Sequence, residues 1–167
     1  METPSESCAT LTLLEGLESF QKYLQLITGK SVKELDLLFD QLDLNLFNDP
    51  AFIDNLSHMV RQHPKARVRI LLKNTRNITS QRCLLLDIAK RLPSKINIRR
   101  ATHPPQDNAI NYVIADRDSL LLRHDRDSYQ GFFNSSARPE AQNLLEEFNT
   151  LWERQSTDIP DLMNFRL

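Results

Sequence analysis

Lysine and arginine side chains concentrate between residues 61 and 100, the part of the sequence best equipped to bind a ligand. This segment holds twelve of them and one acid, Asp87, so it carries a charge of +11, whereas the whole chain has a formal net charge of -1. Guanidinium and ammonium groups bind phosphate oxygens through charge-assisted hydrogen bonds, so the segment is able to supply an anion site. The alternative, which is the favoured interpretation, is that these cations pair with the acidic flanks of the same chain.

Histidine and cysteine give weaker signals. The histidines His58, His63, His103 and His124 show no HxH or HExxH spacing, so we expect no metal site. His103 follows the basic segment in a predicted loop, where it could help to bind an anion or be simply solvated. Cys83 is expected in the first turn of a helix, where the helix dipole lowers a thiol pKa. No paired general base is evident, so a packed or merely exposed thiol is the favoured interpretation.

Four aspartates lie close together near a predicted turn: Asp116, Asp118, Asp125 and Asp127. Hard cations such as calcium and magnesium need several oxygen ligands, which this cluster could supply. Arginines lie between the aspartates and offset their charge, so turn formation is the favoured interpretation.

Composition narrows the classes of function. Three glycines in the whole sequence do not form a Walker loop or a GxGxxG turn, so we expect neither nucleotide motif and no cofactor. The two cysteines give no zinc spacing and no disulfide framework, no secretory signal is visible, and no apolar run approaches the roughly 20 residues of a membrane span. These observations predict a soluble cytoplasmic protein.

Apolar periodicity predicts one α/β domain. Strands and helices alternate, which favours parallel pairing of the strands in one sheet. A β-hairpin and a long final helix should follow, with Ser135 or Ser136 capping that helix and Trp152 in its buried stripe. The expected elements are a helix from Leu13 to near Gly29, a strand over 32–39, a helix from Pro50 to His63, a strand over 67–73, a helix capped by Thr79 or Ser80 and ended by Pro93, a strand over 95–100, hairpin strands over 112–115 and 120–122, and a helix from about Pro139.

The order of these elements from about Asp49 to Gln155 resembles one half of the phospholipase D fold. The stretches that carry this resemblance are RVRILLK, KRLPSKINIRR, INYVIADRDSLLLR and YQGFFNSSARPEAQNLLEEFNTLW. More narrowly, the RLPS-x-I-x-[IR]-R pattern and the closing F-x-x-L-W helix resemble an uncharacterised bacterial phospholipase-D-like domain that occurs alone or attached to acetyltransferase-type domains. The resemblance implies a single phospholipase-D-like half with a mixed β-sheet and helices packed on both faces. We expect a flexible segment over 1–10, this domain over 11–157 and a tail over 158–167.

Active members of that superfamily carry HxKxxxxD, in which histidine attacks phosphorus and lysine binds the phosphoryl oxygens. When Asp116 is aligned with the aspartate, Ala109 stands at the histidine position and Asn111 at the lysine position. Alanine cannot form a phosphoenzyme, so the resemblance implies a domain without this covalent reaction. Asn134 and Ser135 lie roughly where the superfamily places its polar GSxN segment, so a reshaped ligand pocket is expected.

The leading hypothesis is a non-catalytic domain that binds an anionic or phosphorylated ligand or a protein partner. The alternative is a phosphodiesterase or transferase that uses a residue such as His103 and completes its site by forming a homodimer. Association with an acetyltransferase-type domain is a further partner hypothesis, and nucleic acid is a minor one. The candidate ligand-binding residues are Arg67, Arg69, Lys73, Arg99, Arg100, His103, Asn111, Asn134 and Ser135.

Overall fold

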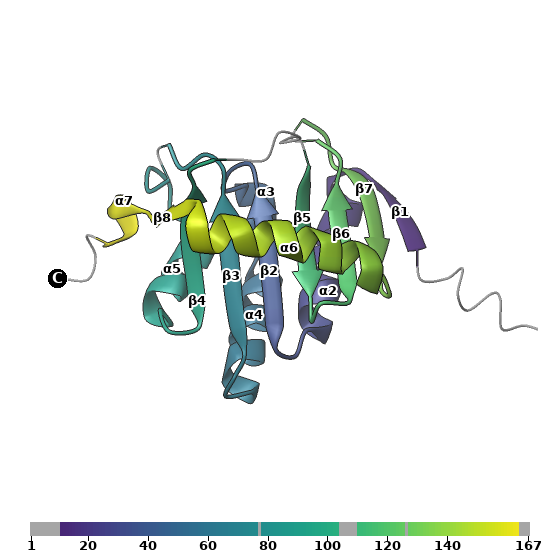
Figure 1. Cartoon of the computed structure of the whole chain (residues 1–167), viewed down its shortest axis with the longest axis horizontal. Coiled ribbons are helices and arrows are strands. Elements are labelled where there is room, and N and C mark those ends of the chain that lie inside the picture. The colour runs from purple at the N-terminus through teal and green to yellow at the C-terminus, as the bar shows by residue number, and fades with distance from the viewer. Residues whose placement is uncertain (1–10, 77, 104–109, 126, 164–167) are drawn as a thin grey trace, which may run out of the picture.

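The computed structural model describes residues 11–76, 78–103, 110–125 and 127–163, which contain one eight-stranded mixed sheet (Figure 1). Its order is β1-β7-β6-β5-β2-β3-β4-β8, in which β2, β3 and β4 are parallel and all other neighbours are antiparallel. The strands are β1 (Leu11–Glu15), β2 (Glu34–Phe39), β3 (Arg67–Leu72), β4 (Ile96–Ala101), β5 (Asn111–Ala115), β6 (Ser119–Arg123), β7 (Gln130–Asn134) and β8 (Ser156–Asp158).

Helices cover both faces of the sheet, as expected from the sequence. Figure 1 shows α6 crossing the front face, while α2, α4 and α5 lie behind it. The helices are α2 (Leu17–Lys30), α3 (Leu44–Phe47), α4 (Pro50–Gln62), α5 (Leu84–Arg91), α6 (Arg138–Arg154) and α7 (Pro160–Met163). A mixed sheet with helices on both faces is the architecture that the resemblance to a phospholipase-D-like half implies. None of the helices is long and apolar enough to cross a membrane within the described ranges.

Two apolar layers, one on each side of the sheet, form the core. Strand β2 reads ELDLLF, and its residues face the two layers alternately: Leu37 packs against α2 and α4, and Leu38 packs toward α6. Such a strand is buried on both faces, which explains its almost continuous apolar sequence. Helix α4 begins where Asp49 accepts the Ala51 N–H at 3.1 Å, with Pro50 in its first turn.

The predicted helix from Leu13 is wrong in its first turn. Residues 11–15 form β1, which pairs antiparallel with β7, and Gly16 separates this strand from α2 with a φ of 96°. The period of two is visible in the burial, because Leu14 is in the core whereas the Leu13 side chain is 77% exposed. Strand β7, which gives β1 its partner, was not expected from the sequence. Residues 1–10 lie outside the described ranges.

Two predicted helix caps are also wrong. Helix α5 starts at Leu84, after Cys83, rather than following Thr79 or Ser80. Helix α6 has Ala137 at its N-cap, and neither Ser135 nor Ser136 caps it. In both cases the chain makes turns before the helix begins, and serine or threonine in such turns resembles a cap in sequence.

The parallel strands define two edges of the sheet that position the candidate residues. At one edge, which we call the upper edge, β2, β3, β4 and β6 end and β5 begins (Figure 1). We call the opposite edge the lower edge. In open sheets with parallel strands, ligands bind where those strands end. The upper edge is therefore the first place to look for a site.

Candidate functional site

A polar hollow of about 270 Å³ lies at the upper edge, between the loops that follow β2 and β3. Amide and hydroxyl groups line it together with one guanidinium group, that of Arg76. The lining residues are Gln41, Leu42, Leu44, Asn74, Arg76, Ile78, Ser80 and Gln81. We call this the upper-edge hollow. Its donors suit an anion, because amides, hydroxyls and guanidinium groups all donate hydrogen bonds to oxygen.

Further cationic residues lie on the same edge of the sheet as this hollow. Arg76 and Arg100 are exposed, and neither side chain makes an ion pair or a hydrogen bond with the rest of the described chain. Lys73 directs its Nζ to the Ile110 carbonyl at 2.8 Å, and the His103 Nδ1 lies 3.0 Å from the Thr102 hydroxyl. Three of the predicted ligand residues, Lys73, Arg100 and His103, therefore share one edge.

Asn111, at the position aligned with the catalytic lysine, is part of the scaffold at this edge. Its side chain is 1% exposed, and its Oδ1 accepts the Asp40 N–H at 2.6 Å. The amide thus joins the start of β5 to the end of β2 and satisfies a backbone donor there. A neutral amide with its oxygen used in this way cannot supply the charge of a phosphate-binding lysine. Ala109 lies outside the described ranges.

Asp116, at the aligned aspartate position, lies at the lower edge in the β5–β6 turn. Its carboxylate accepts the backbone N–H groups of Val32, Lys33 and Glu34 at 2.9, 2.8 and 3.0 Å. Asp116 and Arg117 have φ values of 52° and 62°, as a tight hairpin turn requires. Asp116 therefore fixes the segment before β2, which is a structural use of the residue.

Asn134 and Ser135 do not join Asn111 in one cleft. Asn134 pairs with Leu11 and Leu120 at the lower edge, and its Oδ1 accepts the Ser136 N–H at 3.0 Å. The Ser135 carbonyl accepts the Ser119 hydroxyl at 3.0 Å. Strand β7 runs from the upper to the lower edge, so its last residues lie at the far end from Asn111. The predicted ligand residues Asn111 and Asn134 therefore lie at opposite edges of the sheet.

The remaining predicted residues, Arg67, Arg69 and Arg99, lie on the sheet face that α6 covers, where carboxylates hold them. Asp36 is 1% exposed, and its Oδ1 accepts from Arg67 at 2.9 Å and from Arg69 at 2.8 Å. Arg99 pairs with Asp158 at 2.7 Å. These are intramolecular charge pairs, as in the alternative interpretation of the basic segment.

Trp152 is the aromatic partner of this arginine group. Its ring lies 5.5 Å from the Arg69 guanidinium carbon and 5.7 Å from that of Arg99. The ring is half-buried rather than fully in the core. It thus links β3, β4 and α6 through cation–π contacts.

A second network at the upper edge was not visible in the sequence. The Tyr129 hydroxyl donates to Asp43 Oδ2 at 2.7 Å, and Arg123 lies 3.3 Å from the same oxygen and 4.2 Å from the Tyr129 ring centroid. Burial raises the pKa of the Tyr129 phenol above its ordinary value of 10.0, and the phenol is a hydrogen-bond donor at neutral pH. Asp43 and Tyr129 are 86 positions apart in the sequence, and no local pattern predicts such a contact.

The Cys83 thiol and the aspartate cluster have structural roles, in packing and in turns. Cys83 is buried, in agreement with the favoured interpretation of a packed thiol. Burial raises the pKa of this thiol, because desolvation outweighs the hydrogen bonds from the Leu85 and Leu86 backbone. Asp125 accepts from the Asp127 N–H at 2.8 Å and from Ser128, as in a turn. No group of three or more histidine, cysteine or acidic residues in the described ranges is arranged to hold a metal ion.

A family model for a domain of unknown function, DUF7931, matches residues 17–165. The chain belongs to this family. The match covers nearly all of the sheet, the helices on both of its faces and the upper-edge hollow. Among curated proteins, none matches the chain.

Solved structures resemble this DUF7931 chain in fold. The archaeal chromatin protein TrmBL2 matches with a TM-score of 0.66 at 15% identity, over 94% of this chain and 57% of TrmBL2. NucT from Helicobacter pylori matches with a TM-score of 0.61 at 9% identity, over 89% of this chain and 97% of NucT. Phosphatidylserine synthase from Haemophilus influenzae matches with a TM-score of 0.56 at 12% identity, over 94% of this chain and 41% of the synthase. The chain spans little more than half of TrmBL2 and less than half of the synthase. At these identities the likeness is one of fold, and the phospholipase-D-like half is the fold that the last two share with the chain.

Proposed function

We propose that this chain is a non-catalytic phospholipase-D-like domain that binds an anionic, phosphorylated ligand at the upper edge of its sheet. The observation that carries the proposal is the use of Asn111: the residue at the lysine position is buried and holds the Asp40 backbone. With Ala109 at the aligned nucleophile position, the motif itself supplies no imidazole to attack phosphorus.

Charge and shape support the ligand class. The upper-edge hollow offers the Arg76 guanidinium beside the side chains of Asn74, Ser80 and Gln81, and Arg100 and His103 lie on the same edge. A phosphate monoester has the charge and the acceptor oxygens that these donors would satisfy. Arg67, Arg69 and Arg99 are excluded from this revised set because carboxylates already hold them.

Calorimetric titration with phenyl phosphate at low salt tests the binding. We expect saturable binding to the unmodified chain, and Arg76→Ala should weaken it by about tenfold, the loss of one charge-assisted contact. Arg138→Ala is the matched control, because Arg138 is also an exposed arginine but begins α6, near the lower edge. Equal effects of the two variants, or no binding at all, would contradict the proposal.

The alternative is a phosphodiesterase with a rebuilt site. It would use His103 and be completed by a second copy of the chain at the upper edge. Hydrolysis of bis(4-nitrophenyl) phosphate by the unmodified chain and by His103→Ala decides between the two functions. Equal background rates support the non-catalytic domain, whereas a rate that falls with His103→Ala and with dilution supports the enzyme.

Nucleic acid is a second source of the same phosphate chemistry. The printed title of the TrmBL2 structure describes a novel mode of DNA binding by that protein. In this chain several exposed cations of the basic segment would contact a phosphate backbone, and any DNA affinity should then fall steeply with salt. Phenyl phosphate would compete with DNA only if both occupy the upper-edge hollow. Association with a protein partner, such as an acetyltransferase-type domain, is a further proposal that binding assays with that domain would test.

A further inference from the structure

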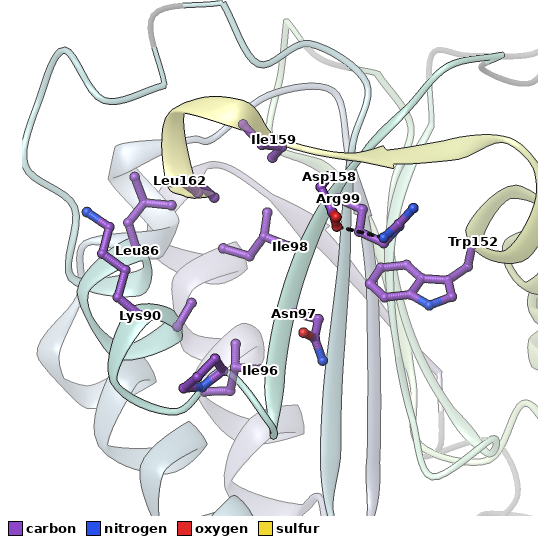
Figure 2. A pocket seen from close by; sticks show the side chains of 12 residues that line it. Leu86, Lys90, Ile96, Asn97, Ile98, Arg99, Trp152, Asp158, Ile159 and Leu162 are labelled. Carbon is purple, nitrogen blue, oxygen red and sulfur yellow. Dashed lines mark hydrogen bonds and ion pairs between the residues drawn. The ribbon is translucent and has the colours of Figure 1, made fainter. Parts of the chain in front are cut away.

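A hollow larger than the upper-edge hollow lies away from it, along the outer edge of β4. Its volume is about 320 Å³, within the range of ligand sites. Figure 2 shows Leu86 and Lys90 of α5 on one side and Trp152 of α6 on the other, with β4 between them. The lining residues are Leu86, Ala89, Lys90, Pro93, Ile96, Asn97, Ile98, Arg99, Trp152, Asp158, Ile159 and Leu162. We call this the β4-edge groove.

The groove follows a strand edge that β8 covers only in part. Strand β8 pairs antiparallel with β4 over Arg99–Ala101, and the register ends there. Below Arg99, the chain leaves the sheet at Ile159 and forms α7 from Pro160. Residues Ile96–Ile98 therefore have β3 as a strand neighbour on one side and the groove on the other, within the described ranges.

Backbone geometry directs polar groups of β4 into this groove. The Val68 N–H of β3 donates to the Lys95 carbonyl, and the Thr102 N–H donates to the Gln155 carbonyl on the β8 side. The backbone N–H and C=O groups of successive residues point to alternate sides of a strand. Those of Ile96 and Ile98 therefore point to the outer edge of β4. The Ile96 N–H donates to the Leu92 carbonyl, so the Ile96 carbonyl and the Ile98 N–H are the groups that an added strand would meet.

The walls suit the alternating side chains of an extended peptide. On the α5 side, the groove has the apolar side chains of Leu86, Ala89 and Leu162, and on the other side it has Asn97 and the Trp152 ring (Figure 2). Successive residues of a strand point to opposite faces, so one set of side chains would pack on apolar groups and the next would lie against polar ones. This is the recognition mode in which a peptide extends a sheet.

Charge selects the composition of that peptide. The lining residues carry a net charge of +1, because Lys90 adds one positive charge to the ion pair that Arg99 makes with Asp158 at 2.7 Å. Arg91 and Lys95 lie close by in the chain and add to the positive field. We propose that the β4-edge groove binds an extended acidic peptide segment of a partner protein, which adds to the sheet beside Ile96–Ile98. The proposal stands independently of anion binding at the upper edge.

The test uses an acetylated hexapeptide of alternating isoleucine and glutamate, titrated into the full chain. The chain contains one tryptophan, Trp152, which lines the groove, so its fluorescence reports occupancy directly. We expect a saturable change with one peptide per chain. Two further peptides of the same sequence are N-methylated at alternate residues, one in each register, so that one edge of each peptide cannot donate. In one of the two registers the affinity should fall at least tenfold. Equal affinity of the methylated peptides would overturn the proposal.

Two charge reversals on α5 form a matched pair. Lys90→Glu changes a residue that lines the groove, whereas Arg91→Glu makes the same change in charge on an exposed neighbour that does not line it. We expect the peptide Kd to rise by about tenfold for Lys90→Glu and by less than about threefold for Arg91→Glu. Equal increases would show a general field effect and contradict a site. The methylated-peptide comparison uses the unmodified chain, so it decides the question even if a variant folds poorly.

Discussion

Two groups of arginines from the same basic segment have opposite surroundings. Under α6, Arg67, Arg69 and Arg99 each contact a carboxylate, and the central one, Asp36, is almost wholly buried. At the upper edge, Arg76 and Arg100 contact no carboxylate in the described chain. A segment charge of +11 thus divides into a part that holds the fold together and a part that can meet a ligand. Substitutions in each part should separate stability from binding.

The largest effect is expected where the buried carboxylate is removed. Asp36→Ala removes the buried carboxylate that Arg67 and Arg69 share and leaves them, in the described chain, only their polar contacts with Glu34 and Asn149. The substitution should lower the free energy of unfolding by about 3 kcal/mol. Urea denaturation followed by circular dichroism measures this. A loss below about 1 kcal/mol would mean that the arginines under α6 are not held as described, and the contrast between the two groups would disappear.

Asp116→Ala tests the structural use of a residue that the superfamily motif assigns to the active site. Three backbone N–H groups lose their acceptor, so we expect a loss of about 2 kcal/mol in unfolding free energy. Asp118→Ala, two residues further in the same turn, is the control and should cost well under half as much, because its carboxylate makes no hydrogen bond or ion pair in the described chain. Similar losses for both variants would contradict the role of Asp116.

The sequence predicted the architecture better than it predicted the site. Apolar runs such as ELDLLF and RVRILL, with the capping pair Asp49-Pro50, located β2, β3 and α4 because burial and local capping leave periodic traces. Strand β1 was not predicted as a strand, because the apolar residues of its sequence LTLLE also fit the start of an apolar helix face.

The site could be predicted only in part because its residues meet through the sheet register. Asn111 was singled out by its position in a motif, and its bond to Asp40 depends on the antiparallel pairing of β5 with β2. Asn134 looked equivalent in sequence, but the direction of β7 carries it to the lower edge. The partners of the arginines depend on the same long-range geometry, so charge counting alone could not divide the basic segment.

The face under α6 should also impose a pH dependence on stability, through Tyr112. Burial, with smaller effects from the Glu147 and Asp36 charges, raises the pKa of Tyr112 above its ordinary value of 10.0. The folded state therefore keeps the phenol proton more tightly than the unfolded state. The stabilisation is complete below pH 10 and is lost as the pH rises through the folded-state pKa.

Comparison of the unmodified chain with Tyr112→Phe between pH 8 and pH 11 measures this effect. Above pH 10 the unmodified chain should lose up to about 1.4 kcal/mol of stability per pH unit more than Tyr112→Phe does. Parallel pH profiles of the two proteins would show that Tyr112 is not buried as described. At neutral pH the variant loses only the weak 3.4 Å bond from the Tyr112 hydroxyl to the Leu144 carbonyl.

The smallest effect on stability is expected at the upper edge. Arg76→Ala and Arg100→Ala remove exposed side chains without a described partner, so each should change the unfolding free energy by less than about 0.5 kcal/mol. The same urea titrations measure it. A larger loss for either variant would place that arginine with Arg67 and Arg69 among the residues that hold the fold.

Amide chemical-shift mapping during a titration with phenyl phosphate tests the central claim most directly. The account predicts that the shifts centre on residues 74–81 with weaker changes near Arg100 and Asn111, that Arg76→Ala suppresses them, and that no phenol is released. Shifts centred on Arg67, Arg69 and Arg99 would contradict the placement of the ligand, and phenol release that depends on the chain would contradict a non-catalytic domain.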